Sequence, residues 1–150
     1  MNLFYSVTFM MIFSFIVQYY MMSYIMTDKV GNITNSLGKV YISSMMATIM
    51  GLAEVFMNNQ MMKKISWNYY SFLFVLLFVL FIVYKKQIGI NDQQYLSEMI
   101  EHHSMALLTS KEILQKTNNY NVKKLASDIV SGQQDEIKYM KHLLLRLENI

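Results

Sequence analysis

The chain of 150 residues contains no cysteine and no proline, and only 15% of its residues are charged. Without cysteine it forms no disulfide, no thiolate metal site and no thiol nucleophile, so cysteine usage does not indicate a redox compartment. The charged fraction is well below the quarter or so that is typical of soluble domains. Hydrophobic residues instead make up 54%, and 15 residues are methionine. Nearly all of the apolar excess lies before residue 89. We therefore expect one chain that is divided between two solvents, lipid and water.

Three apolar stretches predict three transmembrane helices, at residues 3–26, 40–60 and 67–85. Each stretch is close to the roughly 20 residues that cross a hydrocarbon core. The first has no basic region before it and no small-residue cleavage site after it, which favours a retained span over a signal peptide. Tyrosine and tryptophan near the ends of the stretches are typical of membrane interfaces. We therefore expect an integral, multi-pass membrane protein in contact with the lipid bilayer, with residues 1–88 as its transmembrane region.

The lysines leave the orientation in the membrane open. Lys63 and Lys64 lie between the second and third spans, and the other lysines that flank the spans lie on the opposite side. Their larger number favours a cytoplasmic C-terminus, whereas the pair in the short loop favours the reverse. The loop after the first span also contains the triplet Asn32-Ile33-Thr34, a glycosylation sequon of a kind that arises often by chance.

The second span has a methionine face and one acidic residue. Met46, Met50, Met57 and Met61 recur at helical spacing, and Glu54 lies among them. In one interpretation the methionines are flexible packing residues and the glutamate is neutral or paired inside the bundle. In the other, the thioethers form a track for a soft metal ion, because thioethers favour Cu(I). The glutamate is then functional, since an ionisable group inside a membrane is costly.

Residues 89–150 form a second, polar domain in which acidic and basic residues are nearly equal in number. The net charge of +3 therefore comes from the lysines that flank the spans, which indicates contact with lipid head groups and not with nucleic acid. Apolar residues recur at intervals of three and four, which predicts two helices. Asn91 or Asp92 caps the first helix, and residues 118–121 form the turn. A short connection between two such helices predicts an antiparallel hairpin and an all-α chain.

The register of this hairpin brings polar and sulfur-containing side chains to one level. With the turn centred on residues 118–119, the histidine pair at 102–103 faces residues 133–136 of the second helix. The converging residues are Met99, His102, His103, Gln133, Glu136 and Met140, with Met105 at the rim.

These residues form a borderline-soft ligand set of imidazoles, thioethers and one carboxylate. Copper suits the set best, zinc is an alternative through the histidines and the glutamate, and hard cations do not suit it. The chain lacks the Glu-x-x-His pattern of di-iron bundles, the His-Glu-x-x-His zinc motif and the Gly-x-Ser-x-Gly nucleophile turn. We therefore expect metal binding and not an enzyme. The same histidines, opposite Gln133 and Glu136, are equally consistent with a hydrogen-bonded layer that sets helix register.

Two motifs in this domain resemble those of the domain of unknown function 305 family. They are Met-Ile-Glu-His-His-Ser-Met-Ala at residues 99–106 and Gln-Gln-Asp-Glu-Ile-Lys-Tyr-Met at residues 133–140. The resemblance covers residues 92–147. It implies a ferritin-like helical hairpin, a link to copper binding or copper tolerance, and a hairpin outside the cytoplasm. Carried over by position, the motif residues are Met99, His102, His103, Gln133, Glu136 and Met140.

Two hypotheses for the function follow. In the first, a multi-pass membrane protein presents a His/Met copper-binding hairpin that binds metal, confers tolerance or hands metal on. In the second, the hairpin is a structural or interaction module whose polar layer sets helix register and mediates assembly. Because a helical bundle normally closes with four helices, in either case we expect a homo-oligomer formed through the hairpin.

Overall fold

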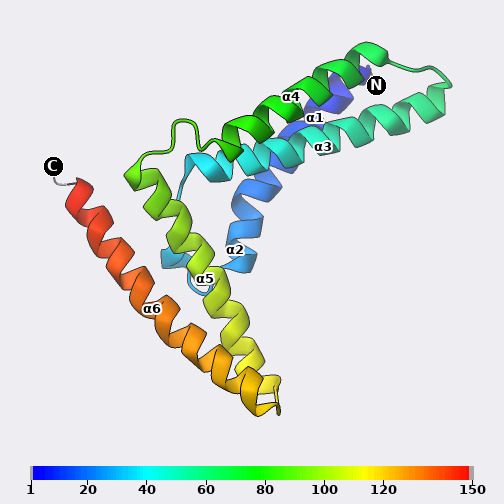
Figure 1. Ribbon diagram of the computed structural model, residues 1–150. Coiled ribbons are helices and arrows are strands. Elements are labelled where there is room, and N and C mark those ends of the chain that lie inside the picture. Colours follow the sequence, from blue (N-terminus) through cyan, green and yellow to red (C-terminus); the bar gives the residue numbers. More distant parts are fainter. Residues whose placement is uncertain (1, 149–150) are drawn as a thin grey trace. The chain divides into compact units, whose positions relative to one another are not determined.

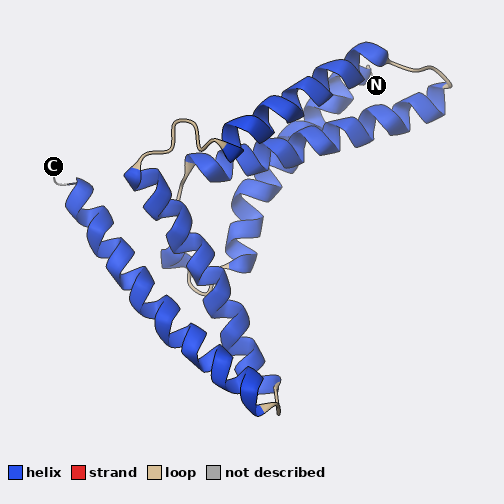
Figure 2. Cartoon of the chain, in the orientation of Figure 1, coloured by secondary structure: helices blue, strands red, loops and turns tan. Residues whose placement is uncertain are grey.

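The computed structural model describes residues 2–148 as helices with short connections, without a strand anywhere in that range (Figure 1). The all-α prediction is confirmed, as the helical cartoon also shows (Figure 2). The chain divides into two compact units. The apolar unit holds residues 2–21 and Leu37–Gly89, and the hairpin unit holds Met22–Ser36 with residues 90–148. The hairpin unit thus includes the last residues of the first apolar helix, Met22–Met26, and the connection that follows them.

Three helical stretches of the described chain are long and apolar enough to cross a membrane, Leu3–Met26, Leu37–Met62 and Trp67–Lys85. The first consists of α1 (Leu3–Ile16), a π-helical turn η1 (Val17–Met21) and α2 (Met22–Met26), and the other two are α3 (Leu37–Met62) and α4 (Trp67–Lys85). They match the predicted spans, except that α3 extends beyond residues 40–60 at both ends. The apolar stretch begins only after Lys39, which set the predicted start at residue 40. A charged residue does not interrupt the backbone hydrogen bonds of a helix, so α3 begins earlier, at Leu37.

Helices α1, α3 and α4 share a small hydrophobic core that contains Val7, Val55 and Leu73. Gly51 of α3 lies against Met11 of α1, and a Cβ at Gly51 would stand only 2.9 Å from Cγ of Met11. The missing side chain therefore permits a close approach of the two helices. Many large apolar side chains of these helices are exposed, which suits a surface that faces lipid.

Glu54 lies on the side of α3 that meets α1, where its carboxylate accepts a hydrogen bond from the hydroxyl of Ser6. Met46, Met57 and Met61, by contrast, are exposed on the surface of the unit. Most of the methionine face therefore lies away from the helix contacts, while the glutamate has a polar partner inside the unit. This arrangement favours the packing interpretation of the second span over a metal track.

The hairpin unit is built on two antiparallel helices, α5 (Asp92–Lys116) and α6 (Tyr120–Glu148), which a turn connects (Figure 1). Asn91 caps α5, because its side chain accepts a hydrogen bond from the backbone N–H of Gln94 at 2.9 Å. The core between the two helices contains Leu96, Ile100, Leu107, Ile137 and Met140.

The turn between α5 and α6 is shorter than the predicted residues 118–121. Oδ1 of Asn119 accepts hydrogen bonds from the backbone N–H groups of Asn121 and Val122, at 3.0 and 3.2 Å. This side chain caps the new helix, so α6 begins at Tyr120. The prediction that residues 120 and 121 interrupt the helix is therefore wrong.

Candidate metal centre

His103 of α5 and Glu136 of α6 make the polar contact at the centre of the predicted site. Nδ1 of His103 lies 2.9 Å from Oε2 of Glu136, and the two side chains are 25% and 57% exposed. Nδ1 is itself buried and makes no hydrogen bond within the described chain. The two atoms are as close as in an ion pair, but their relative orientation does not meet the geometry of a hydrogen bond. Buried polar atoms normally make a hydrogen bond, so a ring nitrogen that approaches a carboxylate without one is a candidate ligand for a bound ion.

Met99 and Met140 lie on one side of this contact. Met99 is four residues before His103 and Met140 is four residues after Glu136, which is about one helical turn in each case. Because the helices are antiparallel, both displacements run in the same direction along the hairpin. The two methionines belong to one hydrophobic cluster, in which Met140 is only 8% exposed. Met140 is therefore buried, and Met99 is partly buried against the same core.

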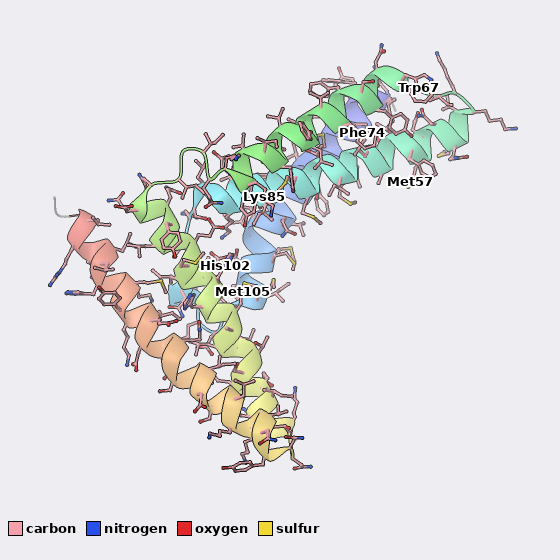
Figure 3. All side chains as sticks on the ribbon, viewed as in Figure 1. Met57, Trp67, Phe74, Lys85, His102 and Met105 are labelled. Carbon is pink, nitrogen blue, oxygen red and sulfur yellow. The ribbon has the colours of Figure 1, made fainter. Side chains whose placement is uncertain are left out.

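Three further predicted residues lie at the border of this group. His102 is exposed, whereas Met105 and Gln133 are half-buried. Figure 3 shows His102 and Met105 close together on α5. No three His, Asp or Glu side chains within residues 2–148 form a group that could hold a metal ion. The structure thus brings His103 and Glu136 together and places Met99 and Met140 in the adjoining core.

The charged neighbour of His102 is Glu98, one turn earlier on α5. Glu98 is only 6% exposed. Its burial raises the pKa of this carboxyl above the usual value of 4.5, the charge of His102 opposes the rise, and the nearby Glu101 adds to it. The exposed histidine therefore has an acidic group beside it on its own helix.

A second polar network lies where residues 27–36, which we call the strap, cross α5. The hydroxyl of Ser104 accepts hydrogen bonds from the backbone N–H of Asp28 at 3.0 Å and from Nδ2 of Asn32 at 3.1 Å. Ser104 is 0% exposed and Asn32 is 6% exposed. Because Nδ2 is the atom that carries the sugar in a glycosylated asparagine, the folded chain leaves no room for a glycan on this sequon.

Charged side chains of both hairpin helices also hold the strap. Nζ of Lys111 lies 2.8 Å from the carboxylate of Asp28, and Nζ of Lys141 donates a hydrogen bond to Oδ1 of Asn32 at 2.6 Å. The sequence did not predict this network. Its signal is a polar face on α5 with members three and seven residues apart, namely Glu101, Ser104 and Lys111.

Comparison with known proteins covers both units of the chain. Residues 85–147, which include the whole candidate site, match the family described as "Domain of unknown function (DUF305)". The "Uncharacterized protein L153" of Acanthamoeba polyphaga mimivirus is 32% identical over 137 residues, which cover 90% of this chain and 88% of that protein. The similarity therefore extends into the apolar helices. No solved structure matches the chain.

Proposed function

Since this chain belongs to the DUF305 family, we propose that its hairpin binds a soft metal ion, with copper(I) as the first candidate. One observation supports the proposal above all. The buried Nδ1 of His103 makes no hydrogen bond within the described chain and lies 2.9 Å from the carboxylate of Glu136. An imidazole nitrogen and a carboxylate oxygen this close together suit a single ion that takes both as ligands.

The surrounding donors suit copper(I) better than zinc. Met99 and Met140 place two thioethers about one turn from the pair, and thioethers select Cu(I) over harder ions. His102 would supply a second imidazole from the exposed side, while Met105 and Gln133 would border the ion. Zinc would use the imidazoles and the carboxylate and would leave the sulfur atoms without a role.

The proposed role is binding without turnover. The three apolar helices would anchor the protein in a bilayer, and the hairpin would lie outside the cytoplasm. There it would bind metal for tolerance or hand it to a partner. A bound ion would supply no chemistry beyond coordination, and the residues of the chain would hold it, shield it from water and release it.

A structural or interaction module is the second candidate. The contacts between the strap and α5 favour it, because they show that α5 uses polar side chains to fix neighbouring segments. In this case the His103–Glu136 pair sets the register of α5 against α6. Exposed apolar residues of α6, such as Leu125 at 61% and Tyr139 at 63%, would then contact a second copy of the chain.

Anaerobic titration with Cu(I) against a competing chelator, on the full chain in mild detergent, separates the two candidates. We expect one equivalent in the wild type and loss of that equivalent in the double variant His102→Ala/His103→Ala. His142→Ala, which changes an exposed histidine of α6, is the matched control and should bind normally.

Full stoichiometric binding by the double variant would contradict the site. A wild type that binds no copper, together with a double variant that loses its oligomer by light scattering, would favour the structural module.

A further inference from the structure

The ends of α3 and α4 border an open groove of about 930 Å³ in the apolar unit. Its walls are aromatic and apolar, with Phe56 from α3 and with Tyr70 and Phe74 from α4. Lys63 and Lys64 lie at its rim, and no acidic residue is among the described residues that line it. The volume is within the range of clefts that bind small molecules. The groove therefore joins a basic mouth to an apolar interior.

The groove lies at one boundary of the membrane if the three apolar helices span it. Its rim is the loop between two candidate spans, Leu37–Met62 and Trp67–Lys85. Figure 3 shows Trp67 at the start of α4 and Phe74 further along the same helix. Seven residues of helix separate them, a rise of about 10 Å. The walls therefore extend from the head-group level, where tryptophan is typical, toward the hydrocarbon.

The lysines at the rim have no partner within the described chain. Their side chains are exposed and form no ion pair or hydrogen bond with other described residues. Lys63 has a left-handed φ of 49°, which ends α3 at the mouth of the groove. Ser66 and the side chain of Asn59 are hydrogen-bonded at 2.9 Å across the loop, so both lysines belong to a closed turn and not to a loose segment.

We propose that this groove binds one anionic glycerophospholipid. Its phosphate lies at Lys63 and Lys64, and an acyl chain runs along Phe56 and Phe74. Two cations without an acidic neighbour complement a head group with a net negative charge, and basic pockets between membrane helices bind such lipids. A free phosphate in solution would leave the apolar walls unfilled. The proposal rests on the membrane spans and is independent of the metal site.

Trp67 is the only tryptophan of the chain and lines the groove, so its fluorescence reports the occupant directly. The full chain is reconstituted in vesicles of phosphatidylcholine with a minor share of phosphatidylglycerol, and either one or the other lipid has brominated acyl chains that quench tryptophan. We expect brominated phosphatidylglycerol to quench Trp67 far beyond its mole fraction. Each lysine near an anionic surface strengthens binding roughly fivefold. The pair should therefore favour phosphatidylglycerol over phosphatidylcholine by roughly 25-fold.

Matched lysine pairs complete the test. Lys63→Gln/Lys64→Gln should lose the preference, while Lys85→Gln/Lys86→Gln, which changes the basic pair at the other end of α4, should keep it. Quenching of the wild type in proportion to mole fraction would overturn the proposal without any variant. Equal loss in both lysine variants would also overturn it, as would displacement of the anionic lipid by glycerol phosphate in solution.

Discussion

The side-chain amide of Asn32 donates a hydrogen bond to the hydroxyl of Ser104, although 72 residues separate them in the sequence. The same hydroxyl accepts a second hydrogen bond from the backbone of Asp28. Because Ser104 is fully buried, water does not compete for these donors. One serine on α5 thus satisfies two polar groups of the strap, and the strap is part of the hairpin unit and not a free loop.

Replacing Ser104 by alanine should destabilise the hairpin unit. The change leaves the buried amide of Asn32 and the part-buried backbone N–H of Asp28 without their acceptor. We expect the free energy of unfolding of the full chain to fall by about 1–3 kcal/mol, measured by denaturant titration in mild detergent with circular dichroism. Ser131→Ala, at an exposed position of α6, is the control. Equal stability of the two variants would show that the strap contacts contribute nothing.

Removal of the ammonium group of Lys111 should lower the free energy of unfolding more than removal of an exposed ammonium group does. Lys111 and Asp28 lie 2.8 Å apart and are only 32% and 11% exposed, whereas Lys116 and Glu112 on the same helix are 69% and 54% exposed. Lys111→Ala should lower the free energy of unfolding by about 1.5–3 kcal/mol. The control Lys116→Ala should change it by less than about 1 kcal/mol. If Lys116→Ala proved as costly, burial of the Lys111 pair would not be the reason.

The elements of the fold follow from local patterns, and for that reason they could be predicted. Three apolar stretches and two segments with helical periodicity predict the helices, and Asn91 was predicted as one of two candidate caps of α5. The strap could not be predicted in this way. Its contacts join residues 63 to 110 positions apart, and single polar residues in a loop leave no periodic trace in the sequence.

The candidate site was predictable to a different extent for each histidine. The hairpin register correctly brings His103 to Glu136. Adjacent residues on a helix point about 100° apart, however, so His102 and His103 do not face α6 equally, and His102 is exposed. A role for His102 as a ligand therefore stays a prediction, one that requires its side chain to reach around the helix.

Glu98 should make the stability of the chain depend on pH. Its pKa is raised in the folded state by burial, so the folded chain holds this proton more tightly than the unfolded chain does. The stabilisation is complete below the ordinary value of 4.5 and is lost as the pH rises through the raised folded value. Glu98→Gln should abolish this decline and increase stability at pH 7, as thermal unfolding across pH would show. The decline should persist in the exposed variant Glu112→Gln, and its persistence in Glu98→Gln would refute the assignment.

Two glycines inside helices should respond in opposite directions to alanine. A Cβ at Gly132 meets no atom within 4 Å, whereas one at Gly51 stands 2.9 Å from Cγ of Met11. Gly132→Ala should raise the free energy of unfolding by about 0.5–1 kcal/mol through helix propensity. Gly51→Ala should lower it by about 1–3 kcal/mol, because Met11 must shift. Stabilisation by Gly51→Ala would mean that α1 and α3 do not pack closely at this point.

X-ray absorption at the copper edge, on the full chain loaded with one equivalent of Cu(I), tests the proposed metal centre most directly. His103, Glu136, Met99 and Met140 together predict a shell that contains both nitrogen or oxygen and sulfur. The conservative double variant Met99→Leu/Met140→Leu preserves the apolar packing and should lose the sulfur contribution while keeping the light-atom one. A wild-type shell without sulfur, or a shell unchanged in His103→Ala, would contradict the account.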